Sequence, residues 1–163
     1  MLPEINTILY ASDLGTNSRP AFRLAVKLAA QNNASITFLH VIEPMNNTAE
    51  NVISNYLSAE MYKELKEAGV TELKATMVKR IEAFCQDELP ADFTFPKGKP
   101  EARIAVGNVE EEILYVADHI NADLIVMGTR THSNLTKLFL GSSAQKVLQR
   151  SKRPVLIAPL DPN

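Results

Sequence analysis

The residues with the clearest potential for chemistry lie in one segment near the end of the chain. After an apolar run at residues 124–127, Gly128 opens a polar loop that ends at Gly141, Ser142 and Ser143, where a helix is predicted to begin. A helix N-terminus presents unpaired backbone N–H groups and a partial positive charge, and both favour a bound phosphate. Glycine lets the backbone approach a ligand closely, or take a positive φ, without a clash at Cβ. The segment is therefore predicted to hold an anion, the alternative being an ordinary capped loop.

The distribution of charge supports an anion site in this segment. Residues 124–160 contain six basic residues and no aspartate or glutamate, whereas the rest of the chain has 19 acidic and 11 basic residues. The net charge of the whole chain is −2, far from the strongly basic balance that is typical of nucleic-acid-binding proteins. A small anionic ligand is predicted, and nucleic acid is not expected as a partner.

Strands and helices alternate along the chain, and this pattern predicts how the segment is positioned. The apolar stretches between the helical patterns are continuous rather than alternating, which indicates strands that are buried on both faces. The fold class is therefore predicted to be α/β, with one open parallel sheet of five strands and helices on both faces. Ligands of such sheets bind beyond the carboxyl ends of the strands, where the strand order reverses. The predicted strands are 7–12, 35–42, 102–106, 123–128 and 154–158.

Several local signals refine the predicted helices. A long helix is predicted at about 59–87, and Gly69 is expected to kink or split it because glycine costs ~1 kcal/mol relative to alanine there. Asn108 with Glu111 forms a capping-box pattern, and Ser142 with Gln145 forms a second one.

Length and composition indicate one ordinary globular domain over residues 1–163, with a variable loop at about 43–58 and a connector at about 88–101. No apolar run is long enough to span a membrane, and the N-terminus lacks the pattern of a signal peptide. The single cysteine, Cys85, follows Ile81 at helical spacing and is predicted to be a buried structural thiol. The predicted location is the cytoplasm, with no membrane partner.

Common catalytic motifs are absent from the sequence. There is no G-x-x-x-x-G-K-[S/T] loop, no G-x-G-x-x-G after the first strand and no G-x-S-x-G elbow. The three histidines and one cysteine do not have the spacing of metal ligands. No catalytic residue and no metal site formed by the protein alone are predicted.

The order of these motifs resembles the universal stress protein family of the ATP-binding type. Gly128, Thr131 and Gly141-Ser142 follow the spacing G-x-x-G-(nine)-G-[S/T], with Thr131 in place of the second glycine. The stretches at 39–42 and 107–113 fit the same family, so the resemblance covers nearly the whole chain. It implies a Rossmann-like, adenine nucleotide alpha hydrolase-like sheet of order 3-2-1-4-5, in which strands 1 and 4 flank the ligand crevice.

The resemblance also implies ATP with Mg²⁺ as the ligand. Asp13 would lie near the ribose or the phosphates, through a metal ion, while Ala11 and the main chain of Val41 would lie against the adenine. Arg130 and His132 lie in the loop along which a triphosphate would extend; each would either contact the triphosphate or be solvated. The implied nucleotide-binding residues are Ala11, Asp13, Val41, Met127, Gly128, Arg130, Thr131, His132, Gly141, Ser142 and Ser143. His40 is predicted to be a packing residue.

The predicted function is a stress-response regulatory protein that binds ATP and signals to an unknown protein partner through its surface and dimer state. A homodimer would form through the last strand, at Val155, Leu156 and Ile157, because an apolar sheet edge is usually covered or paired. Hydrolysis is expected to be slow at most, since no general base is evident. Two alternatives stay open. One is a dimeric interaction protein without nucleotide binding, which Thr131 favours. The other is a slow ATPase or self-phosphorylating switch with Ser142, Ser143 or a loop threonine as acceptor.

Overall fold

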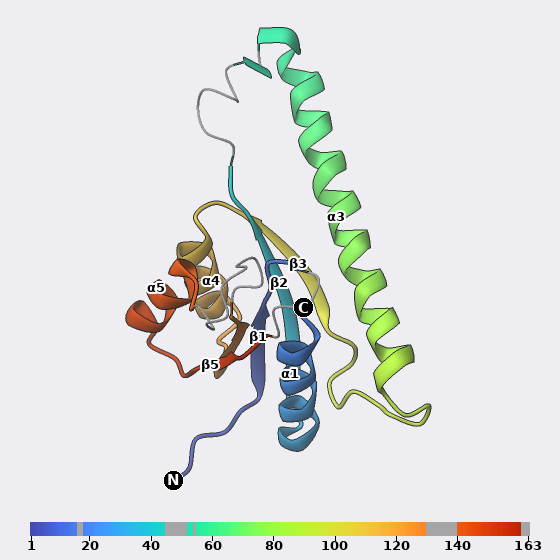
Figure 1. Ribbon diagram of the computed structural model, residues 1–163, viewed down its shortest axis with the longest axis vertical. Coiled ribbons are helices and arrows are strands. Elements are labelled where there is room, and N and C mark those ends of the chain that lie inside the picture. Colours follow the sequence, from blue (N-terminus) through green and yellow to red (C-terminus); the bar gives the residue numbers. More distant parts are fainter. Residues whose placement is uncertain (16–17, 45–51, 54, 130–139, 161–163) are drawn as a thin grey trace.

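A central parallel sheet with helices on both faces forms the body of the protein (Figure 1). A computed structural model describes residues 1–15, 18–44, 52–53, 55–129 and 140–160. The strands are β1 (Thr7–Ala11), β2 (Ser35–Ile42), β3 (Glu101–Val106), β4 (Leu124–Gly128) and β5 (Val155–Ala158). The helices are α1 (Arg19–Asn32), α3 (Ala59–Glu88), α4 (Val109–His119) and α5 (Ser142–Arg150).

The strand order is β3-β2-β1-β4-β5, and every pair of neighbours is parallel. This confirms the predicted fold class and strand order. In the register of the sheet, Ala11 at the end of β1 lies beside Leu39 of β2 on one side and Met127 of β4 on the other. The order reverses between β1 and β4, so the carboxyl ends of these two strands form the crevice in which such sheets bind ligands.

Alternate residues of the strands lie on opposite faces of the sheet and belong to two separate hydrophobic cores. On one face, α1 and α3 pack over an aromatic cluster of Tyr10, Phe22, Phe38 and Phe84, with ring centroids 4.5–5.7 Å apart. On the other face, apolar residues of α4 and α5 pack against β1, β2 and β4. Both faces of the central strands are buried, which is why these strands are continuously apolar in the sequence.

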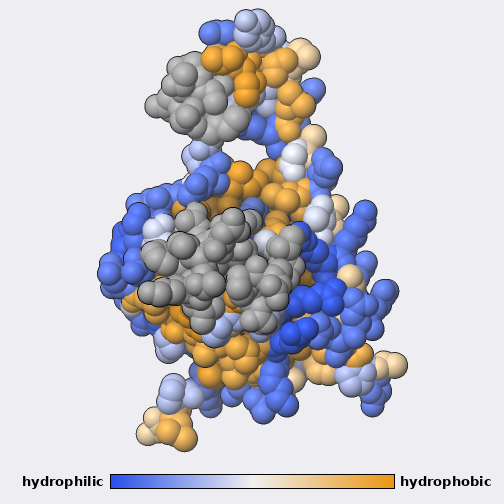
Figure 2. Space-filling model, in the orientation of Figure 1, coloured by the Kyte–Doolittle hydropathy of each residue, from blue (hydrophilic) through white to orange (hydrophobic). Residues whose placement is uncertain are grey.

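Helix α3 is much longer than the sheet can cover. Its buried residues are Met77, Ile81 and Phe84, all in its second half, and the first half rises beyond the sheet (Figures 1 and 2). The prediction of a break at Gly69 was wrong, because the helix runs through it without interruption. No helix in the described part of the chain, α3 included, is long and apolar enough to cross a membrane.

Two further predictions for this region can be compared with the structure. Part of the predicted loop at 43–58 is helical, at residues 52–53 and 55–56, and Leu57 N donates to Ile53 O at 3.1 Å. Cys85 is only partly buried and packs against the edge of the aromatic core, where burial raises the pKa of its thiol. A raised pKa keeps the thiol protonated, as expected for a structural cysteine.

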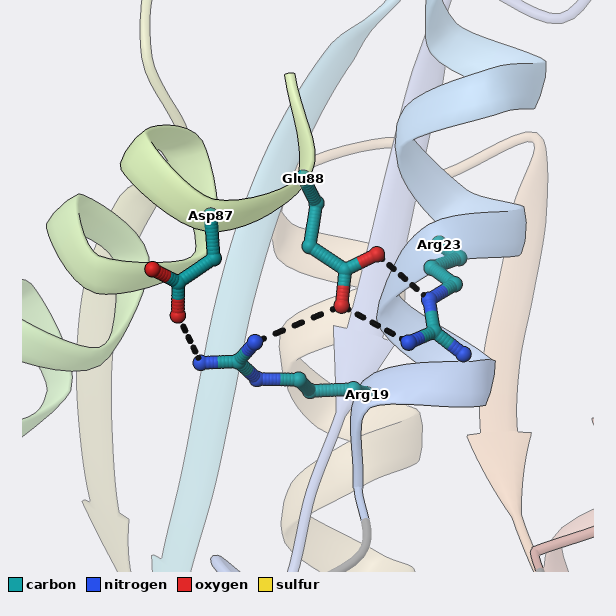
Figure 3. Close-up of polar contacts among 4 residues, drawn as sticks. All are labelled: Arg19, Arg23, Asp87 and Glu88. Carbon is teal, nitrogen blue, oxygen red and sulfur yellow. Dashed lines mark hydrogen bonds and ion pairs between the residues drawn. The ribbon is translucent and has the colours of Figure 1, made fainter.

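An ion network ties the carboxyl end of α3 to the start of α1 (Figure 3). Arg23 makes two hydrogen bonds of 2.7 Å to the carboxylate of Glu88, and the guanidinium of Arg23 lowers the pKa of that carboxyl. Arg19 contacts Asp87 at 2.8 Å and Glu88 at 3.3 Å. The buried segment of α3 is thereby held to α1 as well as to the sheet.

Candidate functional site

A cavity of about 430 Å³ opens at the carboxyl ends of β1 and β4. Eight of the eleven predicted site residues line it: Ala11, Asp13, Val41, Met127, Gly128, Gly141, Ser142 and Ser143. The other three, Arg130, Thr131 and His132, lie outside the described residues. Residues from opposite ends of the chain are thus brought together at the point where the strand order reverses.

One half of the cavity is apolar. Leu39 and Val41 of β2 and Met127 of β4 form its floor, and Val109 and Ile113 at the start of α4 form a wall. Such a surface suits a flat, weakly polar group that enters between the strand ends and α4. The sequence indicated Val41 and Met127 by resemblance, whereas Val109 and Ile113 were not among the predicted site residues.

The remaining part of the lining includes the N-terminus of α5. Gly141 occupies the N-cap position, and no side chain caps the helix there. The predicted capping box of Ser142 with Gln145 is therefore wrong: Ser142 is already the first helical residue, and Gln145 N donates to Gly141 O at 3.1 Å. No acidic residue lies in the first turn, so the positive end of the helix faces the cavity without a neutralising carboxylate of its own.

Neither predicted glycine uses a positive φ. Gly141 has a φ of −52°, and Gly128 is not among the glycines of positive φ, which are Gly98 and Gly107. At Gly128 the missing side chain makes room for Leu160, which also lines the cavity. The backbone N–H of Leu160 donates to the hydroxyl of buried Thr129 at 2.8 Å. This glycine therefore has a packing role that the motif did not reveal.

Asp13 lies at the cavity, as the resemblance implied, and also stabilises a turn. Its Oδ1 accepts a hydrogen bond from Gly15 N at 2.8 Å, as a turn aspartate does, and its exposed side chain also lines the cavity. Glu43 is the other carboxylate in the lining. Among the described residues, no three histidine, cysteine or acidic side chains gather closely enough to hold a metal ion.

His40 was predicted only as a packing residue, but it lines the cavity and contacts the β1 end. Its Nδ1 lies 2.8 Å from Ser12 O. A carbonyl oxygen only accepts, so Nδ1 carries the hydrogen in this contact. The ring thus joins β2 to the loop that carries Asp13. The signal in the sequence was a histidine beside Val41 at a strand end.

An ion pair between α4 and α5 fixes the helix N-terminus beside the cavity. Lys146 Nζ lies 3.2 Å from Glu110 Oε1, and Glu110 is buried with 7% of its surface exposed. The pKa of Glu110 is lowered, first by a hydrogen bond from its own backbone N–H and then by Lys146. The charged form of Glu110 therefore favours the packing of α5 on α4.

Residues 4–159 match the sequence model described as the Universal stress protein family. A relative from Thermus aquaticus, the universal stress protein in the QAH/OAS sulfhydrylase 3′ region, is 31% identical over 151 residues, covering 93% of this chain and 96% of that protein. The solved structure of protein MJ0577 of Methanocaldococcus jannaschii has a TM-score of 0.70 at 24% identity, covering 96% of this chain and 97% of that one. A universal stress protein solved in complex with cAMP has a TM-score of 0.57 at 25% identity, covering 98% and 100% of the two chains.

Proposed function

The chain belongs to the universal stress protein family, and from this premise we propose that it is a stress-response protein that binds ATP with Mg²⁺ in the cavity between β1 and β4. Binding is proposed to alter a surface that a partner protein recognises, and the dimer through β5 is proposed to present that surface twice.

The observation that carries this proposal is the meeting of two chemically different halves in one cavity. Val41, Met127 and Ile113 supply an apolar slot that fits a purine base. The uncapped N-terminus of α5, with Ser142 and Ser143, supplies backbone and hydroxyl donors that fit phosphate oxygens. A nucleotide likewise has a weakly polar base at one end and charged phosphates at the other. The cavity volume of about 430 Å³ lies within the range of small-molecule sites.

A related structure supports an adenine nucleotide as the ligand. The universal stress protein solved with cAMP is 25% identical to this chain and is covered by it along its whole length. In this proposal the Mg²⁺ arrives with the phosphates, and Asp13 is the residue that contacts it, since hard oxygen ligands are the ones Mg²⁺ prefers.

The direct test measures bound nucleotide and then its loss in a designed variant. The purified protein is denatured and its supernatant is analysed by chromatography, and the stripped protein is titrated with Mg-ATP by calorimetry. Gly141→Asp is the decisive variant because the φ of −52° at this N-cap suits aspartate, whose carboxylate would occupy the helix N-terminus in place of phosphate. Gly141→Asn is the matched control, since asparagine caps equally well without a charge.

We expect saturable binding that Gly141→Asp abolishes and Gly141→Asn weakens much less. Absence of both co-purified nucleotide and binding heat would favour the dimeric interaction protein without nucleotide. In that case Thr131→Gly, which restores the second glycine of the family pattern, should recover binding if Thr131 is the cause. Phosphate release that survives stringent purification and is lost in Gly141→Asp would favour the slow ATPase.

A further inference from the structure

We propose that Arg80 of α3 is a positioning residue for the nucleotide site, acting through the loop that carries Asp13. This inference rests on the proposed function. Arg80 Nη1 donates to Leu14 O at 2.8 Å and to Gly15 O at 3.4 Å. Arg80 is not among the residues that line the cavity between β1 and β4, so any effect on a ligand there passes through the loop.

One peptide group connects Arg80 to Asp13. The peptide between Leu14 and Gly15 has its oxygen bound by Arg80 Nη1 and its N–H bound by Asp13 Oδ1, at 2.8 Å each. The orientation of this peptide therefore fixes the direction of the Asp13 carboxylate at the mouth of the cavity. An aspartate that contacts a metal ion or a ribose needs such a fixed direction, because misplacement by a fraction of an ångström weakens the contact.

The loop requires support because its backbone is unfavourable. Leu14 has a φ of 60°, a left-handed conformation that a bulky residue rarely adopts. Within the loop, Ser12 Oγ accepts from Leu14 N at 3.1 Å, and from outside it His40 binds Ser12 O. Arg80 is the contact from the α3 side. The strained turn is thus held by β2 on one side and by α3 on the other.

The part of α3 that carries Arg80 is itself fixed. Met77, Ile81 and Phe84 around it are buried, and the ion network of Arg19 and Arg23 holds the end of the helix (Figure 3). Arg80 therefore couples the position of α3 to the direction of the Asp13 carboxylate. By thermodynamic linkage, a ligand that orders Asp13 must in turn stabilise this position of α3.

The test compares three variants of the full chain in calorimetric titrations with Mg-ATP. Arg80→Met keeps most of the side-chain length but removes both hydrogen bonds. We expect its Kd to rise by up to about tenfold, because the nucleotide must then order the Asp13 loop when it binds. Arg80→Lys keeps a cationic donor and should lie between Arg80→Met and the unmodified protein. Arg23→Met is the matched control, since it removes an arginine bridge between α1 and α3 that does not contact the loop. Its Kd should rise much less than that of Arg80→Met, because Met77, Ile81 and Phe84 still hold this part of α3 in the core.

Hydrogen exchange of the nucleotide-free proteins provides a second measurement. Arg80→Met should speed exchange in the peptide that contains Leu14 and Gly15, whereas Arg23→Met should not. If both variants change the Kd equally, or if Arg80→Met changes neither the Kd nor the exchange, the inference is overturned. If the unmodified protein binds no Mg-ATP, the proposed function fails and the role of Arg80 in nucleotide binding fails with it. Exchange then still decides whether Arg80 holds the loop.

Discussion

Leu160 packs directly onto the α-carbon of Gly128 at the point where β4 enters the cavity. A Cβ atom on Gly128 would lie 2.7 Å from Leu160 Cγ, well inside van der Waals contact. Leu160 is 5% exposed, and its N–H is bound by Thr129, so the side chain has little freedom to move aside. The segment after β5 and the end of β4 therefore form one packed unit.

This contact predicts a strong coupling between two substitutions. We expect Gly128→Ala to lower the free energy of unfolding by about 1–3 kcal/mol through overpacking, and Leu160→Ala to lower it by about 2–4 kcal/mol through a cavity. In the double variant the new methyl group fills part of the space left by Leu160. The double variant should therefore lose less unfolding free energy than the two single variants lose together. Urea denaturation of the four proteins measures this, and additivity within about 0.5 kcal/mol would contradict the contact.

Asparagine at position 13 separates the charge of Asp13 from its role in the turn. The Oδ1 of asparagine still accepts from Gly15 N, so Asp13→Asn should leave the stability nearly unchanged. If the carboxylate contacts Mg²⁺, the variant should bind Mg-ATP about tenfold more weakly, while its affinity for ATP in EDTA changes little. Calorimetry with and without Mg²⁺ measures both. An equal loss under the two conditions would assign Asp13 to the ribose or the turn instead of the metal.

β5 is the last strand of the sheet, and its outer edge allows a sharp test of the proposed homodimer. Pro154 O and Ala158 O accept hydrogen bonds from β4, so the backbone groups of Val155 and Ile157 point to the opposite, outer edge. Ile157→Pro should therefore remove a donor from the dimer edge alone and yield a folded monomer. Leu156→Pro is the control, because it removes a donor on the β4 side and should lower the unfolding free energy by about 1–3 kcal/mol.

Light scattering at micromolar concentration with circular dichroism distinguishes these outcomes. A monomeric unmodified protein, or an Ile157→Pro variant that remains a folded dimer, would exclude dimerisation through the edge of β5.

Glu110 should contribute stability that depends on pH. Its folded-state pKa lies below the ordinary value of 4.5, so the contribution is complete above that value and is lost as the pH falls through the folded-state pKa. Its partner Lys146 is half exposed, so we expect Glu110→Gln to cost under about 1 kcal/mol at pH 7. The difference should shrink as the pH falls below the ordinary pKa of 4.5 and through the lower folded-state pKa. Urea denaturation between pH 3 and 7, with Glu111→Gln as the control in the same helical turn, measures it. A difference that stays constant with pH would contradict the assignment.

The sequence predicted the positions of the strands well because parallel strands buried on both faces leave unbroken apolar runs. β4 is such a run, and it leads directly to Gly128 in the cavity. The strand order did not follow from periodicity, which carries no information on neighbours; it came from the family resemblance and was confirmed by the structure.

Other features could not be predicted because they depend on contacts without a signature in the sequence. Gly69 is solvent-exposed, and in the described part of the chain no packing contact lies within 4 Å of where its Cβ would be. A cost of ~1 kcal/mol is too small to break a long helix. His40 and Arg80 bind backbone carbonyls, which every residue has, so no partner residue marks them. Leu160 is distant in sequence from the glycine that it covers, and only the fold brings them together.

The shape of α3 has a mechanical consequence. At 1.5 Å per residue the 30 residues span about 45 Å, and about 27 Å of this separates Ala59 from the first buried residue, Met77. The helix therefore resembles a lever, with a short arm that carries Arg80 and packs on the core and a long arm that extends beyond the sheet. A rotation of about 10° at the short arm would displace the far end by about 5 Å, given that helix length. A small rotation of the buried end of α3 would thus become a displacement of several ångströms at its far end.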